Sequence, residues 1–101
     1  MKYNLSKGDI EPTAQDMGLI EKKMERIGKL LDPHAVIDIR IARDTHHAKG
    51  EVIACILNAR QGKDVLHAER QGENIQVAFD EALAALKQQL KKVRDKRANT
   101  R

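Results

Sequence analysis

Basic side chains gather at the carboxyl end of this 101-residue chain, where they could bind phosphate groups. The segment 82–101 contains seven Lys and Arg residues and a single acid, Asp95, so its net charge is +6. The 81 residues before it carry 12 basic and 14 acidic side chains, a net charge of −2. A nearly neutral body with one basic end is the charge distribution expected of a protein that docks on a polyanion.

A second basic group lies nearer the amino end, in a segment with helical periodicity. Lys22, Arg26 and Lys29 are separated by four and three residues, a spacing that places them on one face of a helix. If this helix packs beside a helix at the carboxyl end, the two groups form one basic surface. The competing interpretation is that both groups are solvated helix faces, whose cations only complement the helix macrodipole.

The other reactive side chains form no recognisable catalytic or metal-binding pattern. His46 and His47 fall in a predicted turn, and no Cys or His spacing matches a zinc site. Cys55 lies in an apolar run, where we expect a buried and unreactive thiol. We therefore expect a protein that is not an enzyme and that has no metal and no cofactor.

The aromatic content limits the kind of nucleic acid that the chain can bind. Tyr3 and Phe79 are its only Phe, Trp or Tyr residues. Domains that bind single strands usually stack the bases on several aromatic side chains. The composition therefore favours folded RNA, bound through its backbone and its shape.

Size and composition predict one small cytoplasmic domain. The length fits a single domain over 1–98, followed by a short flexible tail at 99–101. A lone cysteine fits a reducing compartment, and no apolar run is long enough for a signal peptide or a membrane span. We expect a cytoplasmic protein that makes no contact with membranes.

Hydrophobic periodicity predicts two helices and four strands. The first helix is expected to start at Thr13, to continue through Leu31 and to be ended by Asp32-Pro33-His34. Asn74 is expected to cap the second helix. The predicted strands are 3–6, 35–43, 51–59 and 64–70, with a turn at 44–50 and a hairpin loop at 60–63.

This order, β-α-β-β-β-α, predicts an α+β fold with one four-stranded sheet and both helices packed on its apolar face. The strand at 51–59 is apolar on both faces, so we expect it to be central. Asp38 and Arg40 alternate with isoleucines and should lie on the opposite, solvated face.

Short motifs occur along the chain in a characteristic order. They are Lys22-Lys23-Met24-Glu25-Arg26-Ile27 with Lys29-Leu30-Leu31, Leu66-His67-Ala68-Glu69 with Gln71-Gly72-Glu73-Asn74, Ala78-Phe79-Asp80, and Gln89-Leu90-Lys91-Lys92-Val93-Arg94-Asp95-Lys96. Together they resemble the ribosome hibernation-promoting factor family, also called the sigma-54 modulation protein family, and the resemblance covers nearly the whole chain. Members share the element order given above. The length of the chain resembles that of the short hibernation-promoting type.

The resemblance implies binding to the small (30S) ribosomal subunit, in the channel that holds messenger RNA and the A- and P-site transfer RNAs. Bound members compete with these RNAs and block translation in stressed or stationary cells. They contact 16S ribosomal RNA through basic residues of both helices. By position, the implied contacts are Lys23, Arg26, Lys29, Lys91, Lys92, Arg94 and Lys96, and the charge argument adds Lys22, Lys87 and Arg97.

The chain departs from the family pattern at four positions, and two other functions stay open. Gln76 replaces a frequent aromatic residue, Asn74 a usual Asp, and Ala85 and Gln88 replace basic residues of some members. The alternatives are a double-stranded RNA-binding or ribosome-assembly module, and a regulator that binds a protein through its basic helix. Off the ribosome we expect a monomer.

Overall fold

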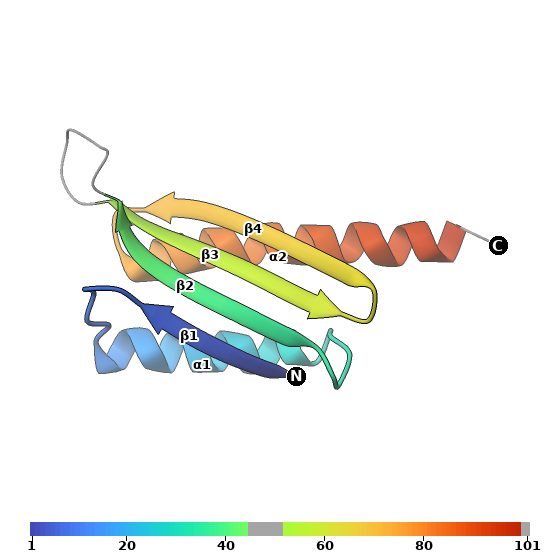
Figure 1. The fold of residues 1–101 in the computed structure, drawn as a ribbon, viewed down its shortest axis with the longest axis horizontal. Helices are drawn as coiled ribbons and strands as arrows, with labels where there is room; N and C mark the ends of the chain where they lie inside the picture. Colours follow the sequence, from blue (N-terminus) through green and yellow to red (C-terminus); the bar gives the residue numbers. More distant parts are fainter. Residues whose placement is uncertain (45–51, 100–101) are drawn as a thin grey trace.

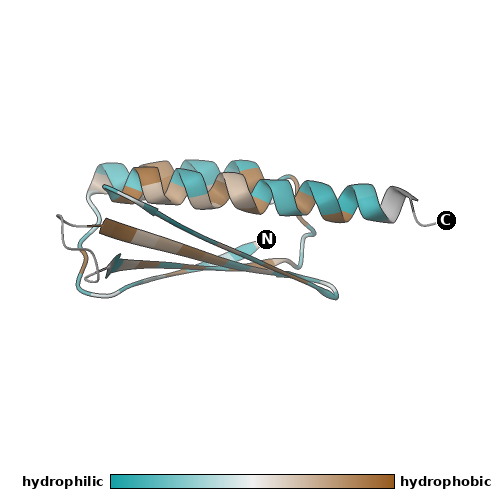
Figure 2. Ribbon diagram, turned by 90° about the horizontal axis from the view of Figure 1, so that it is seen from above, coloured by the Kyte–Doolittle hydropathy of each residue, from teal (hydrophilic) through white to brown (hydrophobic). Residues whose placement is uncertain are grey.

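The structure is a computed structural model in which residues 1–44 and 52–99 are described. Its elements are β1 (Lys2–Lys7), α1 (Ala14–Gly28), β2 (Val36–Asp44), β3 (Val52–Gln61), β4 (Asp64–Gly72) and α2 (Ile75–Asn99). The strands form one sheet in the order β1-β2-β3-β4, in which β1 is parallel to β2 and the other pairs are antiparallel. Both helices cover the same face of the sheet (Figures 1 and 2), so the predicted α+β fold is confirmed.

The core lies between this sheet face and the helices. Ile37, Ile39 and Ile41 of β2 are at most 1% exposed, as the period-two alternation predicts. β3 lies between two strands, so its predicted central position is confirmed. Cys55 and Leu57 of β3 are fully buried against the helices. The core therefore fixes the sheet register, and with it the place of each helix.

The β3–β4 hairpin lies within the described residues, whereas most of the turn predicted between β2 and β3 does not. The predicted loop at 60–63 is wrong in length, because β3 and β4 continue until Gln61 pairs with Asp64. Only Gly62 and Lys63 remain for the turn, and Gly62 has the positive φ of 59° that such tight turns require. The predicted turn at 44–50 falls largely outside the described residues, as do His46 and His47.

Helix α1 begins as predicted and ends earlier than predicted. Thr13 and Asp16 form the capping box, in which each side chain accepts a hydrogen bond from the backbone N–H of the other. The helix was expected to continue through Leu31, but it ends at Gly28. Glycine has a low helix propensity, and a methyl group there would lie 3.3 Å from Cε of Met1. Ending at a glycine lets Met1 pack closely against the helix.

Helix α2 is long and is held at its start by the predicted cap. The Asn74 side chain accepts a hydrogen bond from the backbone N–H of Val77 at 2.9 Å. Phe79, Leu86 and Leu90 face the sheet and are buried. Beyond them the helix continues past the end of the sheet (Figure 2), so its last turns are surrounded by solvent. Neither described helix has the length and apolar composition that crossing a membrane requires.

Candidate nucleic-acid interface

The two helices lie side by side and run in the same direction (Figure 1), and the carboxyl-terminal half of α1 lies beside the segment from Asp80 to Lys87 of the longer α2. The basic residues of α1 lie in this half, and those of α2 begin at Lys87 and continue toward its carboxyl end. Each helix end also carries partial negative charge on its unsatisfied carbonyl groups, which favours cations at these positions. The topology thus places Lys87, the first basic residue of α2, beside the basic residues of α1.

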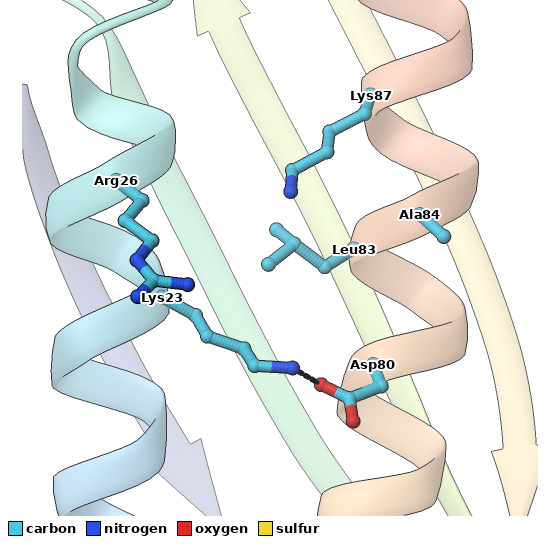
Figure 3. A pocket seen from close by; sticks show the side chains of 6 residues that line it. All are labelled: Lys23, Arg26, Asp80, Leu83, Ala84 and Lys87. Atoms are coloured by element: carbon cyan, nitrogen blue, oxygen red, sulfur yellow. Dashed lines mark hydrogen bonds and ion pairs between the residues drawn. The ribbon is translucent and has the colours of Figure 1, made fainter.

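A groove of about 280 Å³ separates the helices, and we call it the interhelical groove. Lys23 and Arg26 line it from α1, and Lys87 lines it from α2 (Figure 3). Leu83 and Ala84 form an apolar part of its lining. Three of the ten predicted contact residues therefore share one site, and of the predicted stripe of Lys22, Arg26 and Lys29 only Arg26 lines it.

One acid lies among these cations. Asp80 of α2 also lines the interhelical groove, and its Oδ1 forms an ion pair and hydrogen bond with Nζ of Lys23 (Figure 3). The Lys23 side chain is 29% exposed and that of Asp80 is 46% exposed, so both remain accessible to solvent. The pair links the two helices across the groove.

The other α1 candidates face away from this groove. Lys22 and Lys29 are exposed and lie within about 20° of one another on the helix, given about 100° per residue. Lys23 is about 100° from Lys22 and points toward α2 instead. Arg26 lies between these directions, so it belongs both to the groove and to the outer basic face of α1.

The exposed cations near the end of α2 form a second part of the site, which we call the basic end: Lys91, Lys92, Arg94 and Lys96. Lys87, Lys91 and Arg94 recur at helical spacing on the flank that faces α1. Lys92 and Lys96 lie on the opposite flank, the side on which Gln89 contacts β4. The side chain of Arg97 lies outside the described part of the structure.

Most of these cations have no acidic partner. Of the nine candidate cations whose side chains are described, seven make no ion pair or hydrogen bond through their side chains, namely Lys22, Arg26, Lys29, Lys87, Lys91, Lys92 and Arg94. Unpaired cations on one surface repel one another and attract polyanions. The arrangement can therefore neutralise several phosphates of one ligand.

The described chain also contains potential metal ligands and a single cysteine. Within residues 1–44 and 52–99, no three His, Cys, Asp or Glu side chains lie close enough to hold a metal ion. Burial raises the pKa of the Cys55 thiol to about 12, which keeps it protonated near neutral pH. The expectation of an unreactive buried thiol agrees with this environment.

Sequence reasoning missed one residue of the interhelical groove. Asp80 stood out in the sequence only as part of a family motif. Lys23 and Asp80 are 57 residues apart, so no local pattern pairs them. Only the packing of α1 beside α2 brings their charges together.

The sequence and the fold both match known proteins. Residues 3–98 match the family described as "Sigma 54 modulation protein / S30EA ribosomal protein". No curated protein matches the chain significantly. A ribosomal subunit interface protein from Coxiella burnetii superposes with a TM-score of 0.75 at 16% identity, over 94% of this chain and 99% of that one. The Protein Y N-terminal domain from Thermus thermophilus superposes with a TM-score of 0.70 at 16% identity, over 91% and 94%. These two likenesses show a shared fold.

Proposed function

The chain belongs to the sigma-54 modulation protein / S30EA ribosomal protein family, and from this we propose that it is a ribosome hibernation factor. It binds the small ribosomal subunit in the channel for messenger RNA and the A- and P-site transfer RNAs. By occupying that channel it inhibits translation under stress or in stationary phase. The solved structure of similar fold that is described as a ribosomal subunit interface protein supports this proposal.

The observation that carries the proposal is the joint basic surface of the two helices. The basic end follows the interhelical groove along α2, and seven of the nine proposed contact residues whose side chains are described have no partner in the described chain. Each cation that reaches a phosphate releases condensed counterions from the RNA, which drives binding. The proposed 16S ribosomal RNA contacts are Lys22, Lys23, Arg26, Lys29, Lys87, Lys91, Lys92, Arg94, Lys96 and Arg97.

Under this proposal the protein acts by filling the channel for messenger and transfer RNA, and it needs no catalysis, metal or cofactor. It works in the cytoplasm, where ribosomes translate, and it is a monomer when it is not bound. A rigid α+β domain suits such a role, because its two helices present charge in a fixed geometry. The few aromatic residues fit recognition of the shape and backbone of folded RNA.

Sedimentation with purified 30S subunits tests the proposal. The protein should pellet with the subunits, and transfer RNA bound in the P site should reduce the bound fraction. A variant with Lys91→Gln, Lys92→Gln and Arg94→Gln should lose most of the binding. The matched control removes the same charge outside the two helices, with Lys2→Gln and Arg40→Gln on strands and Lys63→Gln in the β3–β4 turn, and should bind as the wild type does.

Two added measurements, binding to naked RNA duplex and partner retention after nuclease treatment, separate the alternatives. A protein that binds naked RNA duplex as tightly as 30S subunits, without competition from transfer RNA, would be a general duplex-binding module. If ribosome binding is absent and a protein partner is retained after nuclease treatment, the basic helix serves a protein-binding regulator instead.

A further inference from the structure

The interhelical groove contains an arrangement that works against simple phosphate binding. Asp80 is a carboxylate within a site whose other charged side chains are Lys23, Arg26 and Lys87. A carboxylate repels a phosphate that approaches the same groove. It also neutralises Lys23 through the ion pair between the two helices (Figure 3).

The pair divides the groove into two electrostatically different parts. Arg26 and Lys87 have no acidic partner in the described chain and can accept a phosphate at once. Lys23 can contribute only if it leaves Asp80 or shares its charge with the ligand. Partly exposed ion pairs contribute little to stability, so a correctly placed phosphate can replace the carboxylate as a partner of Lys23.

We propose that Asp80 is a selectivity residue, which keeps Lys23 from binding phosphate groups indiscriminately and thereby favours RNA of matching shape over other polyanions. The inference rests on the proposed function, because it assumes that the groove receives a ribosomal RNA phosphate. An RNA surface that fits both helices brings enough contacts to draw Lys23 away from Asp80. A duplex of arbitrary sequence brings fewer contacts and meets a groove in which Lys23 is already neutralised. Selectivity then arises from the repulsive carboxylate of Asp80 as well as from the attractive cations of the groove.

Asp80→Asn tests the proposal, because it keeps the shape of the side chain and removes its charge. Asp95→Asn is the matched control: it removes one negative charge from the same helix, at an exposed position beside the basic end. Each variant is titrated with purified 30S subunits and with a mixed-sequence RNA duplex, at several KCl concentrations. Thermal unfolding of the same samples checks that all proteins are folded.

We expect Asp80→Asn to bind the duplex roughly three- to tenfold more tightly than the wild type, and to steepen the log–log salt dependence by about 0.9, the value for one added phosphate contact. Affinity for 30S subunits should change less than twofold, so the ratio of the two affinities falls. Asp95→Asn should change both affinities by a similar, smaller factor. In a Lys23→Gln background, Asp80→Asn should then behave as Asp95→Asn does.

Two results would overturn the inference. One is equal behaviour of Asp80→Asn and Asp95→Asn in the wild-type background, which would mean that Asp80 acts only through net charge. The other is weaker duplex binding by Asp80→Asn, which would mean that the carboxylate supports the site. Failure of the wild type to bind 30S subunits refutes the proposed function, and that result is distinct from either of these.

Discussion

The side-chain amide of Gln89 hydrogen-bonds to both backbone polar groups of His67. Its Oε1 accepts from the His67 N–H at 3.2 Å, and its Nε2 donates to the His67 carbonyl oxygen. β4 is an edge strand, so the outward backbone groups of His67 have no neighbouring strand to pair with. The Gln89 amide thus takes the place of a peptide group from a fifth strand and ties α2 to the sheet just before the basic end.

Gln89→Ala should therefore lower the free energy of unfolding by about 1–2 kcal/mol, the net value of two hydrogen bonds in a partly exposed setting. Urea unfolding followed by circular dichroism measures this change. The control is Gln88→Ala, which alters a neighbouring exposed side chain without a partner in the described structure. Equal stability of the two variants would show that water replaces the Gln89 amide without cost.

Much of the fold could be predicted, because hydrophobic periodicity depends on which side of each element faces the core. The alternation in β2 and the stripe of Phe79, Leu86 and Leu90 in α2 both identified buried faces. The helix end at Gly28 was not predicted, because the pattern continues to Leu31, which is buried although it lies beyond the helix. Burial and helix geometry are separate properties, and periodicity reports the first.

The candidate site was predictable in its residue types and not in its pairings. Charge counts and helical spacing are local properties of the chain, and they suffice to identify the basic residues. The opposition of Arg26 and Lys87 across the groove, and the bond between Lys23 and Asp80, depend on how two distant helices pack. Such long-range contacts leave no local signal in a single sequence.

Leu86→Ala should destabilise the domain by about 2–5 kcal/mol, because Leu86 is fully buried and its truncation leaves a cavity. Leu30→Ala is the control, since Leu30 is 47% exposed and its loss should cost about 0.5 kcal/mol or less. Denaturant unfolding of both variants gives the comparison. A small effect at Leu86 would mean that the core relaxes around the cavity.

Acid should weaken the domain partly through Asp16. The Thr13 backbone N–H, the Gln76 side-chain amide and the Thr13 hydroxyl all lower the pKa of this carboxyl below its ordinary value of 3.8, and burial opposes them. The unfolded chain therefore takes up the proton first, so the stabilisation is present above pH 3.8 and is lost as pH falls through the folded pKa.

Asp16→Asn should flatten that part of the stability profile, and Glu21→Gln, an exposed α1 change, should not. Urea midpoints measured from neutral pH down to the acid transition provide the test. If Asp16→Asn and wild type lose stability in parallel over this range, other carboxyl groups control acid unfolding.

Cys55 should resist alkylation in the folded protein. Its thiol is fully buried, and its pKa of about 12 leaves very little thiolate at pH 8. An unfolded cysteine has a pKa near 8.5, so the reactive fraction should be about a thousandfold greater in urea. Mass spectrometry after iodoacetamide treatment, with and without urea, measures the ratio. Rapid labelling of the folded protein would indicate frequent opening of the sheet around β3.

Ribosome binding should weaken steeply as salt concentration rises. If roughly five of the proposed side chains reach phosphates, the slope of log affinity against log salt should be near −4. Replacing Lys91, Lys92 and Arg94 with Gln should make this slope less negative by about 2–3, about one for each phosphate contact removed.

The fold of this triple variant should remain, because these three side chains are exposed and lie outside the core. Filter binding to 30S subunits at several KCl concentrations measures the slopes, and thermal melting checks the fold. The control triple variant at Lys2, Arg40 and Lys63 should keep the wild-type slope, because those residues lie outside the two helices. If both triple variants shift the slope equally, binding depends on net charge, and the basic end is only a solvated helix terminus.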